Sequence, residues 1–199
     1  MLSQHRNTHN RAANAIPVDH ILDCAYDLLL QVGIQRLNMA EIARKAGISR
    51  ATLYRRWPNT SAVTAALVTR EFAALAARTQ SNARTGRRRL VSVAVRLVGA
   101  LREHPLLCKI VEVDPEFLLP YLLRRRGSST EHQLVMIEDG LRAGIADGSI
   151  RRRNTALMAR SVLLTAMSFA LSGCVMADAV TIQALDAELA DILDRYLAP

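Results

Sequence analysis

Apolar residues recur at helical spacing near the beginning of the chain. A stripe that repeats every three or four residues indicates an amphipathic helix. Pro17 is typical of a helix start and Gly33 of a helix end, so the pattern predicts a first helix from Val18 to Val32. Its apolar stripe is formed by Ile21, Leu22, Ala25, Leu28, Leu29 and Val32.

Two shorter helices joined by a glycine turn are predicted next. Asn38 is a helix cap with Glu41 three residues on, and Ser49 can cap the helix after the turn. Pro58 ends that helix, because proline disfavours the helical conformation in the residue before it. Asn59 can cap a longer fourth helix that runs to about residue 79. The apolar anchors expected inside this region are Ile42, Ala43, Ala46, Ile48, Leu53 and Trp57.

The rest of the chain predicts helices separated by polar or glycine-containing breaks. The segment 82–89, which ends in three consecutive arginines, indicates a linker. No series of alternating apolar and polar residues predicts a strand. We therefore expect an all-α protein of about nine helices, with a three-helix head and a helical body. Apolar periodicity places the helices of the body over 90–101, 105–113, 115–126, 130–146, 154–173 and 181–196.

The charge distribution narrows the choice of partner. The net charge is +8, which favours an anionic partner, with nucleic acid first and a membrane surface second. Basic residues outnumber acidic ones over 1–60, whereas acidic residues outnumber basic ones from residue 127 onward. Such asymmetry is typical of a DNA-binding head on a body with another task. Half of the residues are hydrophobic but only 4% are aromatic, which predicts an aliphatic core of packed helices.

Several other classes of protein are disfavoured. Three widely spaced cysteines do not indicate a disulfide framework or a metal site, and they suit a reducing, cytoplasmic compartment. The first twenty residues lack the apolar segment of a secretory signal. The uncharged run 161–177 is short for a membrane span, so we expect no membrane partner. It fits a helix at a protein interface, with a core helix of a monomer as the alternative. No motif indicates an enzyme, a cofactor or a bound metal.

The segment 33–58 has the layout of a helix-turn-helix, whose second helix enters the major groove of DNA. Arg50 and Arg55 can bond to guanine, and Thr52 can contact a thymine methyl. Tyr54 and Arg56 suit phosphate oxygens, which fix position rather than read sequence. A basic helix with a merely solvated face is the alternative. The expected DNA contacts are Asn38, Ser49, Arg50, Ala51, Thr52, Tyr54, Arg55, Arg56 and Thr60.

The same segment resembles the DNA-binding head of the TetR/AcrR family of transcriptional repressors, over about residues 17–70. Two positions depart from the family pattern. Thr60 and Ser61 stand where the family usually has a lysine and an acid, and Ala40 cannot read a base as a long polar side chain does. We therefore expect recognition to depend on the second helix of the motif. The matching residues are Gly33, NMAEIA over 38–43, KAGISRATLY over 45–54 and WP over 57–58.

The resemblance implies a homodimer that binds a near-palindromic operator in double-stranded DNA and a small-molecule effector, which we expect to be apolar. We expect a flexible basic arm over 1–16, with a DNA-contacting arm as the alternative. The helix-turn-helix domain then spans 17–62, and a regulatory and dimerisation domain spans 63–199. Candidate effector contacts, which are otherwise core or surface residues, are Cys108, Phe117, Tyr121, His132 and Met136. The expected dimer interface contains Val162, Ala166, Phe169, Ala170, Leu185, Leu189 and Ile192.

The leading hypothesis is thus a ligand-responsive, dimeric repressor that binds a specific DNA sequence. The alternative is a basic protein without a ligand that binds nucleic acid or a membrane surface regardless of sequence. The two hypotheses differ in whether binding discriminates one DNA sequence from another.

Overall fold

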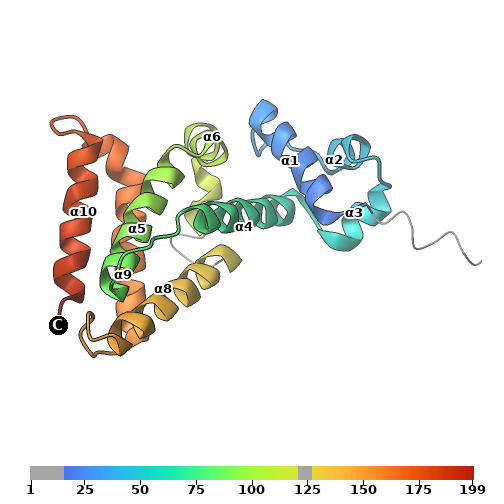
Figure 1. Cartoon of the computed structure of the whole chain (residues 1–199). Coiled ribbons are helices and arrows are strands. Elements are labelled where there is room, and N and C mark those ends of the chain that lie inside the picture. The colour runs from blue at the N-terminus through green and yellow to red at the C-terminus, as the bar shows by residue number, and fades with distance from the viewer. Residues whose placement is uncertain (1–15, 121–126) are drawn as a thin grey trace, which may run out of the picture. The chain divides into compact units, whose positions relative to one another are not determined.

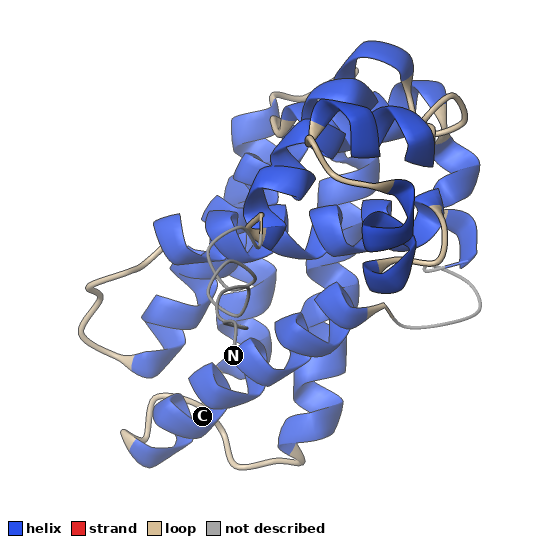
Figure 2. Cartoon of the chain, turned by 90° about the vertical axis from the view of Figure 1, so that its right-hand side faces the viewer, coloured by secondary structure: helices blue, strands red, loops and turns tan. Residues whose placement is uncertain are grey.

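The computed structural model describes residues 16–120 and 127–199, and helices joined by loops make up these ranges (Figure 2). Within them there are nine α-helices and one 3₁₀ helix, and no strand. The prediction of an all-α protein is therefore confirmed. Contacts between Cα atoms divide the chain into two compact units, Met1–Thr64 and Ala65–Pro199.

The first unit contains three helices and the start of a fourth, and their apolar stripes form its core. The helices begin and end close to where the caps predict them. Ile21, Ile42 and Leu53 come from three different helices and are all fully buried. The helices are α1 (Val18–Val32), α2 (Met39–Lys45), α3 (Arg50–Arg56) and α4 (Thr60–Arg78), of which α4 continues into the second unit.

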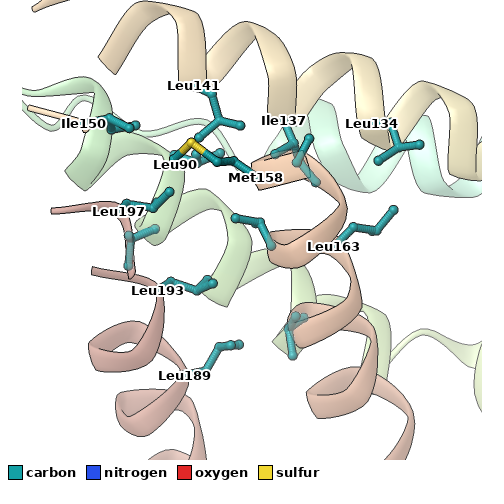
Figure 3. Close-up of a cluster of buried hydrophobic side chains, with 14 residues drawn as sticks. Leu90, Leu134, Ile137, Leu141, Ile150, Met158, Leu163, Leu189, Leu193 and Leu197 are labelled. Atoms are coloured by element: carbon teal, nitrogen blue, oxygen red, sulfur yellow. The ribbon is translucent and has the colours of Figure 1, made fainter. Parts of the chain in front are cut away.

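The second unit is built around α5, which packs against α8, α9 and α10 (Figure 1). The core between these helices is aliphatic, as Leu90, Leu141, Met158 and Leu193 illustrate (Figure 3). The elements of this unit after α4 are α5 (Gly86–Arg102), α6 (Pro105–Val113), η1 (Pro115–Phe117), α8 (Ser128–Ala146), α9 (Thr155–Met176) and α10 (Ile182–Leu197).

The start of α5 corrects the linker predicted over 82–89, because the three arginines of that segment lie in the first turn of the helix. Three cations at a helix N-terminus oppose the helix dipole. The carboxylate of Asp147 offsets this, since the backbone N–H of Gly86 donates to its Oδ2 at 2.6 Å. The N–H of Arg87 donates to Oγ of Ser149 at 3.0 Å. Hydrogen bonds from Ser149 and then from Gly86 hold the pKa of Asp147 below its ordinary value.

Two glycines let α5 and α8 approach backbone to backbone. A Cβ atom on Gly86 would lie 2.5 Å from the backbone nitrogen of Gly144, closer than real Cβ atoms come. A Cβ atom on Gly144 would in turn collide with the side chain of Ile150, which is itself buried. This contact and the Asp147 cap together fix the N-terminal end of α5.

Candidate nucleic-acid interface and ligand cavity

The turn between α2 and α3 is set by one cap and one glycine. The N–H of Ala40 donates to Oδ1 of Asn38 at 2.8 Å, which starts α2. Gly47 has a φ of 67°, in the left-handed region that favours glycine. The N–H of Ile48 then donates to the carbonyl of Ala43 at 3.0 Å and closes the turn. The predicted helix-turn-helix geometry follows from these local contacts.

The outer face of α3 presents polar groups to solvent while Leu53 anchors its inner face, with no exposed surface. Tyr54 is 51% exposed, and neither Arg50 nor Arg55 pairs with a carboxylate in the part of the chain that the structure describes. Uncompensated arginines on an exposed helix face are well suited to phosphates and guanine edges. The side chains exposed on α3 are those of Arg50, Ala51, Tyr54 and Arg55.

Ser49 and Thr52 hold the start of α3 together. The N–H of Thr52 donates to Oγ of Ser49 at 3.1 Å, and the two hydroxyl oxygens lie 2.9 Å apart. Thr52 is half-buried, so its methyl is less open to a base than the side chains of Arg50 or Tyr54. The base contact expected of Thr52 stays a prediction, and Ser49 caps α3 as the sequence predicts.

Arg56 and Thr60 also lie in the first unit. Both terminal nitrogens of Arg56 donate to the carbonyl of Ile16, at 3.3 Å each. This contact attaches Ile16, two residues before α1, to the end of α3. The phosphate contact of Arg56 stays a prediction. Thr60 is half-buried at the first residue of α4. The predicted arm over 1–16 lies, except for Ile16, outside the described residues.

A cavity of about 430 Å³ lies within the second unit. Its walls are mostly apolar and come from α4, α5, α6, α8 and α9, with Leu97 and Met167 among them. A volume of 300–1,000 Å³ is typical of sites for small organic ligands. Val68, Phe72 and Leu75 of α4 form one part of the wall.

Three of the five predicted effector contacts, Cys108, Phe117 and Met136, line this cavity. His132 is not among the lining residues, and its contact with an effector stays a prediction. It is exposed on α8, and its Nδ1 lies 2.8 Å from the carbonyl oxygen of Ser128, one turn earlier. Tyr121 lies outside the described residues.

Charged residues that the sequence did not single out gather where α5 ends and α6 begins. Oε2 of Glu71 lies 3.4 Å from Nε2 of His104, and Arg70 binds the other oxygen of that carboxylate at 2.6 Å. Arg102 forms an ion pair with Asp186. Glu71, Arg102 and His104 all line the cavity.

Comparison with known proteins decides the family. Residues 21–67 match the model of the bacterial regulatory proteins, tetR family. Over 181 residues the chain is 34% identical to Mb2274c, an uncharacterized HTH-type transcriptional regulator of Mycobacterium bovis, across 89% of this chain and 92% of that protein. Its counterpart Rv2250c in Mycobacterium tuberculosis is 33% identical over the same share. This chain belongs to the TetR family. It is therefore a DNA-binding transcriptional regulator, and the predicted family is confirmed.

Solved structures share the fold of this TetR-family regulator at low sequence identity. The TetR-family repressor QsdR of R. erythropolis matches with a TM-score of 0.69 and 15% identity, over 92% of this chain and 98% of QsdR. The regulator FadR of Bacillus subtilis, solved in complex with stearoyl-CoA, matches with a TM-score of 0.64 and 16% identity, over 91% and 100%. These likenesses show the fold alone.

Two residues of the dimer interface predicted for this TetR-family regulator lie inside the second unit. Val162 and Leu189 are buried in its core, 1% and 0% exposed. Their contact with a second chain stays a prediction. Ala166 and Ala170 are half-buried and line the cavity, which makes them inward-facing as well.

The exposed apolar surface of α9 lies on a different stripe from the predicted one. Leu157, Leu164 and Leu171 are seven residues apart, Val175 is one turn further, and all four are at least 40% exposed. Seven residues are two helical turns, so the four side chains share one face. The remaining predicted interface residues, half-buried or exposed, are Phe169, Leu185 and Ile192.

By length and composition alone, α9 is the one helix in the described residues that could cross a membrane. Its inner face packs into the core, where Met158 and Ala159 are buried against the neighbouring helices. One buried face and one exposed apolar face also suit a helix that packs against a second protein chain.

Proposed function

We propose that this regulator is a repressor that binds a near-palindromic operator as a homodimer and leaves it when a small apolar effector occupies the cavity. The observation that carries the proposal is the exposed face of α3. Its arginines Arg50 and Arg55 pair with no carboxylate among the described residues, and Leu53 anchors the opposite face of the helix. The exposed stripe of α9 supports the dimer, and the composition of the cavity supports the effector.

Arg50 and Arg55 recognise bases in the proposed complex. Ala51 lies at the start of α3, where its methyl group can approach a thymine methyl. A bidentate arginine–guanine pair contributes about 1–3 kcal/mol of discrimination against the wrong base. Tyr54 donates to a phosphate and fixes the position of the helix rather than reading sequence. Ala40 contributes no such base contact, so the second helix of the motif determines specificity.

Dimerisation buries Leu157 and Leu164, the two leucines of the exposed stripe that do not line the cavity, against the same residues of a second copy. Fully burying an exposed leucine side chain contributes about 1.5–3 kcal/mol. Leu157 and Leu164 are 64% and 69% exposed, so each contributes a large part of that figure when a second copy covers it. A two-fold dimer presents two recognition helices to half-sites one helical turn of DNA, about 34 Å, or a multiple of it apart. The operator should therefore be close to palindromic.

Release by an effector would act through α4. This helix begins at Thr60, four residues after α3 ends, and its later residues Val68 and Phe72 line the cavity. Within the second unit, two polar contacts hold it: Oγ1 of Thr69 lies 2.8 Å from Oγ of Ser128, and Glu71 faces His104. An effector that binds better when α4 is displaced shifts the regulator toward that form. Coupling of this kind typically changes the affinity for the other ligand, here DNA, by about 5–150-fold.

The FadR structure supports an effector with an apolar body, because that protein was solved with stearoyl-CoA. The walls contributed by α5 and α9 in this regulator are similarly suited to hydrocarbon.

A gel shift with the DNA upstream of the regulator's own gene tests the DNA-binding part, at one fixed salt concentration because phosphate contacts depend on salt. We expect the regulator to bind this DNA specifically, so that an excess of unrelated competitor DNA displaces little of it. Arg50→Ala and Tyr54→Ala should each weaken it at least tenfold. Arg153→Ala is the control, since it removes an exposed positive charge from the second unit. Equal binding to unrelated DNA would favour the sequence-indifferent alternative and contradict the proposal.

A further inference from the structure

Arg102 is the most deeply buried of the charged residues at the polar end of the cavity. Its side chain is 5% exposed, against 20% for Glu71 and 11% for His104. Nη2 binds the carboxylate of Asp186 on α10. Nη1 is buried and has no hydrogen-bond partner in the part of the chain that the structure describes. A buried guanidinium N–H without an acceptor is costly, so an acceptor that reached it would bind favourably.

The charges around Arg102 already balance. Asp186 pairs with Arg102, and Arg70 pairs with Glu71, which also faces His104. A ligand carboxylate would bring an unmatched negative charge into this buried end, beside two existing carboxylates, and would pay for its desolvation. A carbonyl oxygen accepts the hydrogen bond of Nη1 without adding charge.

The rest of the cavity determines the other end of the ligand. Leu97 of α5, Ile137 of α8 and Met167 of α9 offer hydrocarbon surface without hydrogen-bonding groups. The volume of about 430 Å³ is at the lower end of the range for ligand sites. It therefore suits a medium-length chain.

We propose that the effector is an uncharged carbonyl compound of medium chain length, whose oxygen accepts a hydrogen bond from Nη1 of Arg102. The regulatory role of this ligand rests on the proposed function. Binding of the ligand at Arg102 does not require DNA binding. Arg102 is part of the cavity wall, so the proposal places the ligand oxygen beside its guanidinium.

Gly173 and Gly99 provide a matched pair of probes for this nitrogen. A Cβ atom on Gly173 would lie 3.0 Å from Nη1 of Arg102, so a methyl group there would cover the donor. A Cβ atom on Gly99 would lie 3.8 Å from Nη2, at ordinary contact distance. Both glycines are in helices, and the two alanine variants differ in which nitrogen they approach.

The test compares three eleven-carbon probes, 2-undecanone, undecane and undecanoate, on the full-length protein. Binding is measured by displacement of the neutral dye Nile red and by thermal shift without dye. We expect 2-undecanone to bind about tenfold more tightly than undecane, or about 1.4 kcal/mol, and more tightly than undecanoate.

Arg102→Lys keeps the charge opposite Asp186 but removes Nη1, so it should abolish the preference for the ketone. Gly173→Ala should reduce that preference, and Gly99→Ala should leave it unchanged.

Equal binding of ketone and alkane to the wild-type protein overturns the proposal, as does a preference that survives both Arg102→Lys and Gly173→Ala. Tightest binding of undecanoate would assign the site to carboxylates instead, and no binding of any probe would remove the cavity as a ligand site. DNA release is measured separately. A ketone preference without DNA release would leave the Arg102 site standing and refute the release by an effector.

Discussion

The contact between α5 and α8 makes Gly86→Ala the sharpest structural perturbation of the second unit. The added Cβ would meet backbone atoms of Gly144, which cannot rotate away as a side chain can. The two helices must separate, and the hydrogen bond from Gly86 to Asp147 must lengthen. Overpacking typically costs about 1–3 kcal/mol of stability, and a collision with backbone atoms belongs at the upper end of that range. We therefore expect Gly86→Ala to lower the free energy of unfolding by about 3 kcal/mol.

Gly99→Ala is the matched control on the same helix. Its Cβ meets nothing closer than 3.8 Å, and alanine is favoured over glycine inside a helix by about 0.5–1 kcal/mol. We therefore expect Gly99→Ala to stabilise the protein slightly while Gly86→Ala destabilises it.

Urea unfolding followed by circular dichroism measures both variants. With a slope of about 1–3 kcal/mol per molar urea, the Gly86→Ala midpoint should fall by about 1–3 M. Trp57 is the single tryptophan and lies in the first unit, so its fluorescence follows that unit separately. A Gly86→Ala midpoint within about 0.3 M of wild type would refute the close approach of α5 and α8.

Three further predictions concern the interface, the α5 cap and Arg56. Leu164→Asp should yield a monomer in analytical ultracentrifugation, and a dimer that persists at micromolar concentration would exclude this face. The lowered pKa of Asp147 means that its contribution to stability is present above the ordinary aspartate pKa and is lost as the pH falls through the folded value. The melting temperature of Asp147→Asn should therefore lie furthest below wild type near neutral pH and converge with it in acid, and a constant gap would contradict this. Arg56→Ala should destabilise the first unit by about 1 kcal/mol, through loss of the bonds to Ile16, as read by Trp57 fluorescence during unfolding.

Local signals explain why the helix-turn-helix could be predicted from sequence. Asn38 and Ser49 accept hydrogen bonds from N–H groups within three residues, and Gly47 adopts its left-handed conformation within the turn itself. Such contacts involve neighbours in the chain, so the pattern of residue types contains them. Asn154 and Thr181 cap α9 and α10 in the same way.

Contacts between distant residues account for what the sequence left out. Thr85 caps α5 locally, but the first two N–H groups of the helix bind Asp147 and Ser149, some sixty residues further along the chain. The sequence pattern does not contain these distant contacts, so the arginines before residue 90 indicate a linker. Since α9 is apolar almost all round, periodicity could not show that Val162 faces the core. In the sequence, Arg102 looks like an ordinary surface charge at the end of a helix. Only the packing of α10 shows that its side chain is buried beside Asp186.

A nuclease footprint on the DNA upstream of the regulator's own gene tests the central claim most directly, because it reports specificity, symmetry and spacing together. The account predicts two protected half-sites related by a dyad and separated by about 10–10.5 base pairs or a multiple of that spacing. Protection should disappear with Arg50→Ala and persist with Arg153→Ala. Uniform protection along the fragment, or a pattern unchanged by Arg50→Ala, would contradict the account.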